Sequence, residues 1–330
     1  MSLPLANASL EAVIEPRLAL VEERLRDAVT QSDALADATS RHLVNAGGKR
    51  LRPLLTLLAA QLGDASRPEV IDAAVVVELT HLATLYHDDV MDSAPTRRGA
   101  PSAHEVWGNS VAILTGDLLF ARASRVVAGL GPDAVRIQAE TFERLCLGQL
   151  HETVGPPDDV DPVDHYVQVL ADKTGSLIAT SARFGAMFAG CEARVVRRVS
   201  EYGELAGVAF QLADDVLDIR SSAQVSGKTP GTDLREGVAT MPVLLLRRRV
   251  VEVGDPADAD LLARIDGDLS KDAVLAGVVA QLAAHSVVEE TAALARDWAG
   301  RAKETVAELP AGDVRDAFVV FADALVARAS

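Results

Sequence analysis

Apolar residues recur at helical spacing along most of the chain. In the segment 69–92, Val75, Leu79, Leu82 and Tyr86 lie three or four residues apart, which is the spacing of one face of an α-helix. Segments that contain Gly or Pro interrupt this pattern and predict the ends of the helices. We therefore expect helices over residues 8–28, 33–46, 51–62, 69–92, 103–128, 132–154, 161–171, 174–190, 193–221, 238–250, 256–264, 271–308 and 312–328.

The composition predicts the fold class. Of the 330 residues, 49% are hydrophobic and only 4% are aromatic. Short β-branched runs between Gly or Pro residues are missing, so helices are the expected structure. Because the chain contains neither a low-complexity linker nor a repeat of solenoid length, we predict a single all-α domain over residues 1–330.

The formal net charge limits the partners of the chain. It is −16, and the isoelectric point is near 4.8. This balance argues against nucleic-acid binding and against attraction to an anionic membrane surface. An anionic ligand would therefore need a local basic cluster.

Cysteine content and hydropathy predict the location. Cys146 and Cys191 are too few for a disulfide framework and are typical of a reducing compartment. The N-terminus lacks a basic region followed by an apolar core, and no segment contains 18 apolar residues without a charge. We expect a cytoplasmic protein.

Three aspartates stand at the end of the apolar segment 69–92. Asp92 is four residues after Asp88 and three after Asp89 on the predicted helix, so their carboxylates share one face. Like charges at this spacing destabilise a helix unless a cation compensates. Mg²⁺ would do so, since it takes carboxylate, water and phosphate oxygens as ligands.

The same pattern occurs a second time, 126 residues further along the chain. Asp214, Asp215 and Asp218 again have the DDxxD spacing on an apolar helical background. Two such helices could present their carboxylates to each other across a cleft and hold several Mg²⁺ ions. That arrangement suits a polyanion, and a diphosphate is the natural candidate.

Basic residues lie in short segments near these motifs. "GGKRLRP" carries Lys49, Arg50 and Arg52 at a predicted helix start, where backbone N–H groups also favour an anion. The other cationic positions are His81, Arg97, Arg98 and Lys173, together with Lys228 and Arg235 in the predicted loop 221–237. Arginine and lysine side chains are suited to phosphate oxygens.

These motifs together resemble those of the trans-type isoprenyl diphosphate synthases, the polyprenyl synthetase family. The similarity rests on "GGKRLRP", "HDDVMD" with "RRG", "DKTG", "FQLADDVLD" and "GKTPGTDLREG", in that order between about residues 40 and 245. It implies the isoprenoid synthase fold, with helices around a deep central cavity, and a homodimer. It also implies the reaction, in which an allylic diphosphate ionises, isopentenyl diphosphate attacks the carbocation, and a proton is lost.

The resemblance also implies roles for the motif residues. The ligands of Mg²⁺, three ions per active site with substrate bound, would come from the two aspartate sets: Asp88, Asp89, Asp92, Asp214, Asp215 and Asp218. The implied catalytic side chains are Asp88, Asp92, Lys173, Asp214 and Lys228. The implied substrate-binding side chains are Lys49, Arg52, His81, Arg97, Arg98, Thr174 and Gln211. One departure is Val238, where many members have Lys.

The residues before the first aspartate motif predict the length of the product. If the growing tail runs towards the N-terminus of the first aspartate helix, the residues four and five before Asp88 form the first floor. They are Thr84 and Ala83, and both are small. We therefore expect a product of about C30 to C50, for quinone side chains, made from geranyl or farnesyl diphosphate and released with transient membrane contact. A short-chain farnesyl or geranylgeranyl diphosphate synthase is the alternative.

Three other classes compete with this interpretation. His87 beside Asp88 would suit a His/Asp metal phosphohydrolase, but that class needs further metal-binding histidines. A terpene cyclase shares the first aspartate motif, but it has no second substrate to occupy the isopentenyl diphosphate residues. A non-catalytic partner subunit of a heteromeric synthase typically has degraded aspartate motifs, whereas both are intact here.

Overall fold

The structure is a computed structural model that describes residues 8–220 and 230–327. It divides into two compact units. The described part of unit 1 comprises residues 8–146, 176–204 and 303–321, and that of unit 2 comprises residues 147–175, 205–220, 230–302 and 322–327. The prediction of a single domain stays a prediction.

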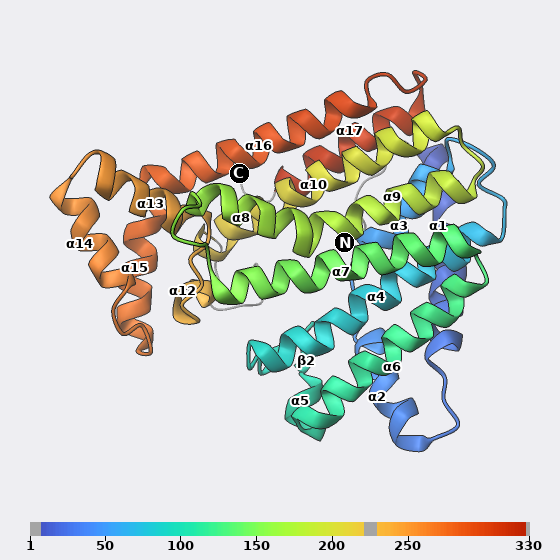
Figure 1. The fold of residues 1–330 in the computed structure, drawn as a ribbon, viewed down its shortest axis with the longest axis horizontal. Helices are drawn as coiled ribbons and strands as arrows, with labels where there is room; N and C mark the ends of the chain where they lie inside the picture. Colours follow the sequence, from blue (N-terminus) through green and yellow to red (C-terminus); the bar gives the residue numbers. More distant parts are fainter. Residues whose placement is uncertain (1–7, 221–229, 328–330) are drawn as a thin grey trace. The chain divides into compact units, whose positions relative to one another are not determined.

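Unit 1 contains most of the N-terminal half of the chain, whose helices are labelled in Figure 1. Its elements are α1 (Ala8–Val29), α2 (Ala34–Asn45), α3 (Leu51–Ala60), α4 (Glu69–Met91), β1 (Thr96–Arg97), β2 (Ala100–Pro101), α5 (Ala103–Trp107), α6 (Asn109–Ala128) and α9 (Ser176–Phe188). Four helices contribute residues to both units: α7 (Pro132–Val154), α10 (Ala193–Arg220), α16 (Ser286–Val306) and α17 (Asp313–Val326).

Helix α4 forms the centre of unit 1. It packs against α1, α3, α6 and α9, and most of its residues are buried. Taken singly, α4 alone among the described helices is long and apolar enough to cross a membrane, but 72% of its most apolar window is buried inside the protein. Its apolar character is therefore explained by core packing, because a helix that is apolar on all sides is buried.

Unit 2 contains shorter helices. They are α8 (Pro162–Leu170), the π-helix η1 (Ala171–Gly175), α12 (Thr232–Arg235), α13 (Met241–Glu252), α14 (Pro256–Ile265) and α15 (Asp272–Ala283). Helix α8 packs against η1 and α13, and α14 packs against α13 and α15. A buried carboxylate links this region, since Asp258 accepts hydrogen bonds from Arg249 Nε at 3.0 Å and His285 Nε2 at 2.9 Å.

The all-α prediction is confirmed, because the described residues contain helices, loops and a single pair of two-residue strands. Two helices that were expected to be continuous are each divided into two, so these predictions were wrong. The helix expected at 103–128 breaks at Gly108, which has φ +83°, and the one expected at 271–308 breaks between Ala283 and Ser286. Both breaks lie within apolar periodicity, so the sequence pattern alone did not predict them.

Candidate active site

The first aspartate motif ends the central helix of unit 1. Asp88 is partly exposed, Asp92 is exposed, and Asp89 has 0% exposed surface. Helix α4 ends at Met91 and Asp92 is its C-cap. A helix C-terminus carries partial negative charge, so three carboxylates there need a compensating cation.

Asp89 receives that compensation from the hairpin that follows. Arg97 Nε on β1 donates to Asp89 Oδ1 at 2.6 Å. The second oxygen, Oδ2, is buried and has no hydrogen-bond partner among the described residues. Burial raises the pKa of Asp89, while the charge and hydrogen bond of Arg97 oppose that rise.

The segment "GGKRLRP" contains two arginines with different roles, one structural and one in the candidate site. Arg50 is buried with φ +49° at the N-cap of α3, and it binds Glu22 and, at 2.8 Å, Glu78 Oε1. Burial disfavours its charge, but these two carboxylates raise the pKa of Arg50 above its ordinary value. Arg50 therefore fixes the turn before α3, while Lys49 beside it is exposed.

Arg52 lies two residues beyond Arg50 and has a different environment. Its Nε is buried with no hydrogen-bond partner in the described part of the chain. Burial lowers the pKa of Arg52 to about 10, with Arg98 adding to the decrease and Glu78 and Asp88 opposing it. A buried guanidinium donor without a partner is the feature expected of an anion-binding side chain.

Arg98 is held near this position by a close backbone contact. Its guanidinium donates to the carbonyl oxygens of Gly47 and Leu43. Gly48 has φ +144°, and a Cβ added there would lie 2.8 Å from Arg98 Cζ. The backbone conformation thus favours glycine at position 48, and a side chain there would displace the Arg98 guanidinium. Burial lowers the pKa of Arg98.

His81 completes a basic cluster in unit 1, which we define as Arg52, His81, Arg97 and Arg98. Burial and then the positive charges of these arginines and Arg50 lower the pKa of His81 well below its usual value. His81 is therefore neutral at neutral pH. The arginines of this cluster favour an anion such as a phosphate group.

The second aspartate motif lies in unit 2, on α10. Asp214 and Asp218 are partly exposed, whereas Asp215 is 2% exposed. Asp215 accepts hydrogen bonds from the Tyr166 hydroxyl, at 3.0 and 3.2 Å, and from the Met241 backbone N at 3.2 Å. Burial and then the charge of Asp233 raise the pKa of Asp215 well above its usual value.

Lys173 and Thr174 are presented by the π-helix η1. Lys173 binds Glu152 of α7, and Thr174 Oγ1 donates to Gln211 Oε1 at 3.3 Å. The extra residue in a π-helical turn changes the direction of the side chains, and such turns are frequent at functional sites. The sequence did not predict this turn. Lys228, also expected in the site, lies outside the described residues.

The aspartate carboxylates are the candidate metal ligands of the site. Within residues 8–220 and 230–327, no group of three or more His, Cys, Asp or Glu side chains is close enough to hold a metal ion. Paired carboxylates nevertheless suit Mg²⁺, which usually binds one or two of them and completes its shell with water and substrate phosphates. In the first motif Asp88 and Asp92 are the accessible carboxylates, because the Asp89 side chain is fully buried.

The two residues expected to set product length differ in burial. Ala83 is completely buried, and its carbonyl oxygen would lie 3.1 Å from a Cβ added at Gly116 of α6. Thr84 is partly exposed, and its hydroxyl donates to the His81 carbonyl oxygen at 2.8 Å. Thr84 is therefore on the more accessible side of α4, and Ala83 is at the packed contact with α6.

His87 takes part in that same packed contact. Its Nε2 lies 3.1 Å from the Ile113 carbonyl oxygen and 3.3 Å from Asp117 Oδ1, both on α6. His87 is thus directed to α6, so the structure gives no support to the metal phosphohydrolase alternative.

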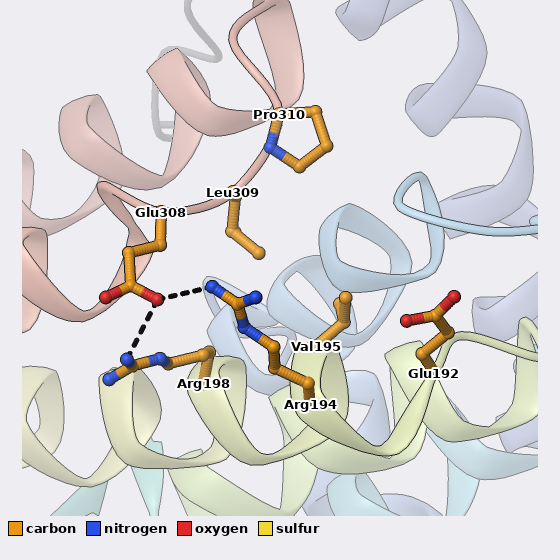
Figure 2. A pocket seen from close by; sticks show the side chains of 7 residues that line it. All are labelled: Glu192, Arg194, Val195, Arg198, Glu308, Leu309 and Pro310. Atoms are coloured by element: carbon orange, nitrogen blue, oxygen red, sulfur yellow. Dashed lines mark hydrogen bonds and ion pairs between the residues drawn. The ribbon is translucent and has the colours of Figure 1, made fainter.

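A surface pocket of about 140 Å³ in unit 1 has none of the expected site residues in its lining (Figure 2). Arg194 and Arg198, which line it, both bind Glu308, at 2.7 and 2.9 Å. Because one carboxylate pairs with both arginines, this pocket is poorly suited to a polyanion. The basic cluster around Arg52 is the better candidate site.

The fold and these side chains define an all-helical protein with two carboxylate-bearing helices and a basic cluster suited to phosphate groups. The chain belongs to the polyprenyl synthetase family, since the family model "Polyprenyl synthetase" matches residues 33–309. The family predicted from the motifs is therefore confirmed.

Full-length relatives support this assignment. The nonaprenyl diphosphate synthase of Mycobacterium tuberculosis is 44% identical over 98% of this chain and 96% of that protein. A crystal structure of the polyprenyl synthase from Caulobacter crescentus, complexed with calcium and isoprenyl diphosphate, has a TM-score of 0.89 and 34% identity, covering 97% of each chain. That of geranylgeranyl pyrophosphate synthase from Corynebacterium glutamicum, with the same ligands, has a TM-score of 0.86 and 40% identity, covering 98% of this chain and 99% of that one.

Proposed function

We propose that this protein is a long-chain trans-polyprenyl diphosphate synthase. As a member of this family it is a prenyltransferase, and the family uses isoprenoid diphosphate substrates. The observation that carries the long-chain assignment is the 44% identity with a nonaprenyl diphosphate synthase over nearly the whole of both chains. The small residues Ala83 and Thr84 before the first aspartate motif agree with it.

The aspartates are assigned to Mg²⁺, on which the family generally depends. Asp88 and Asp92 of α4 and Asp214 of α10 are the proposed first ligands, with three ions per active site as the proposed number. Bound Mg²⁺ supplies positive charge to a departing diphosphate. Support comes from the exposed or partly exposed surface of all three side chains.

The basic residues are assigned to the two diphosphates. Lys49, Arg52, His81 and Arg98 are proposed to bind isopentenyl diphosphate, because Arg52 has an unpartnered Nε among the described residues and His81 lies in the field of the arginines. Arg97 and Lys173, together with Lys228, are proposed to bind the allylic diphosphate. The contacts to the allylic diphosphate would strengthen as negative charge gathers on it as the leaving group.

The reaction follows from these assignments. The C–O bond of the allylic diphosphate breaks, and the electron pair leaves with the diphosphate. The double bond of isopentenyl diphosphate then forms the new C–C bond, and the released diphosphate takes the proton. The hydroxyl of Thr174 and the amide oxygen of Gln211 are proposed to stabilise the cation as dipoles, which fits their mutual hydrogen bond of 3.3 Å.

The assembly and location are also proposals. We assign the protein to the cytoplasm as a homodimer that contacts a membrane transiently for product release. Val106 of α5 and Ile113 and Leu114 of α6 are apolar and 42–65% exposed, so these two helices have apolar surface that a second copy would cover. The net charge of −16 argues that membrane contact is not driven by anionic lipid.

The experiment that tests the function is an elongation assay. The protein is incubated with Mg²⁺, labelled isopentenyl diphosphate and dimethylallyl, geranyl or farnesyl diphosphate, and the product length is measured. We expect products of C30 or longer that disappear with a chelator and in Asp88→Ala. Products of C15 or C20 would establish a short-chain synthase instead, and no elongation with any primer would favour a non-catalytic partner subunit.

A further inference from the structure

The middle aspartate of the second motif differs from its neighbours in burial. Asp214 and Asp218 are partly exposed, while Asp215 is 2% exposed. On an α-helix, residues four apart lie within about 40° of each other, and adjacent residues lie about 100° apart. Asp214 and Asp218 therefore share one face of α10, and Asp215 points away from it.

Both oxygens of Asp215 lie within hydrogen-bonding distance of protein donors. The Tyr166 hydroxyl on α8 lies 3.2 Å from Oδ1 and 3.0 Å from Oδ2, and the backbone N of Met241 lies 3.2 Å from Oδ2. Tyr166 is itself only 8% exposed. Because the residue is buried and these donors lie against its carboxylate, Asp215 is much less accessible to a metal ion than Asp214.

The Met241 contact has a specific structural effect. Met241 is the first residue of α13, and the side chain of the N-cap residue, Thr240, makes no capping hydrogen bond. The first N–H groups of a helix need an acceptor, and a carboxylate there is also favoured by the helix dipole. Asp215 thus caps α13 from α10, while Tyr166 ties the same carboxylate to α8.

We infer that Asp215 is a positioning residue rather than a metal ligand, and that Tyr166 acts through it to hold the Asp214–Asp218 face of α10. The inference rests on the proposed function for one premise, that the Asp214–Asp218 face of α10 binds metal and diphosphate. Tyr166 has no role in the sequence motifs of the site. Its assignment comes from the contacts of unit 2 alone.

The test measures metal binding separately from elongation. Mn²⁺ is titrated into the full-length protein with inorganic diphosphate and followed by EPR, and kcat and KM are measured in parallel. Asp214→Asn should weaken Mn²⁺ binding by about tenfold or more, whereas Asp215→Asn, which keeps an acceptor oxygen for Met241 and Tyr166, should change it less than about twofold. Asp215→Ala, which removes that acceptor, should lower kcat more than Asp215→Asn does.

Tyr166→Phe removes only the hydroxyl and should lower kcat about fivefold with little change in KM. In the Asp215→Ala background it should have no further effect, because its action passes through that carboxylate. Tyr202→Phe is the matched control, since Tyr202 is a buried tyrosine whose hydroxyl donates to the Phe318 carbonyl oxygen at 2.6 Å in unit 1. It should lower stability but leave kcat and Mn²⁺ binding unchanged.

Three results would overturn the inference. They are equal loss of Mn²⁺ binding in Asp214→Asn and Asp215→Asn, additive effects of Tyr166→Phe and Asp215→Ala, and no Mn²⁺–diphosphate binding by the wild-type protein. A protein that binds Mn²⁺ and diphosphate as expected but elongates no primer would refute the proposed function alone. The binding titration and the thermal stability of the variants would still decide the role of Asp215.

Discussion

Arg97 Nε lies 2.6 Å from Oδ1 of Asp89, and the Asp89 side chain has no exposed surface. The pair joins the end of α4 to the hairpin β1–β2 that carries Arg97 and Arg98. A buried carboxylate that loses its ion-pair partner is left uncompensated, which costs far more than the loss of an exposed pair. The position of the hairpin therefore depends on this contact.

Arg97→Ala should consequently lower the free energy of unfolding by roughly 3 kcal/mol. The measurement is urea unfolding without ligands. Arg24→Ala is the matched control, because the Arg24–Asp72 pair has side chains 58% and 32% exposed and should contribute less than about 1 kcal/mol. Similar small losses in both variants would contradict the structural role of the Asp89–Arg97 pair.

Arg50 and Arg52 should respond oppositely to the same substitution. Arg50→Met leaves the buried Glu78 without this ion pair and also removes one partner of Glu22, so it should destabilise the protein by roughly 3 kcal/mol. Arg52→Met removes a buried donor that lacks a partner among the described residues, so it should leave the unliganded protein as stable or raise its stability by about 1 kcal/mol.

Arg52 should also affect how much a bound ligand stabilises the protein. Isopentenyl diphosphate should raise the Tm of the wild-type protein, since a ligand that binds only the folded state stabilises it. The increase should be largely lost in Arg52→Met. A full ligand-induced shift in that variant would remove Arg52 from the proposed diphosphate site.

His81 should make the folded state sensitive to acid. Its pKa is lowered well below 6.5 in the folded protein, so the unfolded state binds the proton first as the pH falls. Stability contributed by neutral His81 is therefore full above about pH 6.5 and decreases as the pH falls towards the folded pKa. His81→Gln should lose less stability than wild type between about pH 7.5 and 5.5, and parallel curves from thermal unfolding would argue against this assignment.

Product length should respond to Thr84 at little cost in stability. Thr84→Phe places a ring on the partly exposed side of α4 and should shorten the product. Ala83→Phe should also shorten it, but Ala83 is fully buried against α6, so overpacking should cost about 1–3 kcal/mol. Leu85→Phe, about 100° around the helix from Thr84, is the control and should keep the wild-type product. An unchanged profile in both Thr84→Phe and Ala83→Phe would refute the proposed direction of the tail.

Release of a long product should limit turnover in water. Detergent should therefore raise the steady-state rate several-fold without changing the first turnover, as expected when product release is slow. A burst experiment with and without detergent measures both. Equal steady-state rates would show that release is not limiting.

Periodicity and glycine or proline breaks predicted most of the helices. Helices α1, α4 and α7 lie within a residue or two of their predicted bounds because their signals are local. The breaks at Gly108 and after Ala283, and the π-helix over Ala171–Gly175, were not predicted. They arise where packing or a special backbone conformation competes with an otherwise continuous helical pattern.

The sequence by itself determined the chemistry of the site, because two DDxxD motifs and the basic segments contain the required side chains whatever their partners. Only the tertiary structure decided how similar residues divide their roles. Arg50 is bound by Glu22 and Glu78, while Arg52 is left with an unpartnered buried Nε among the described residues. Asp215 is buried and accepts hydrogen bonds from Tyr166 and Met241, while its neighbour Asp214 keeps exposed surface. The reason is physical: spacing fixes the face of a helix on which a side chain lies, but its burial and charge partners come from segments distant in the chain.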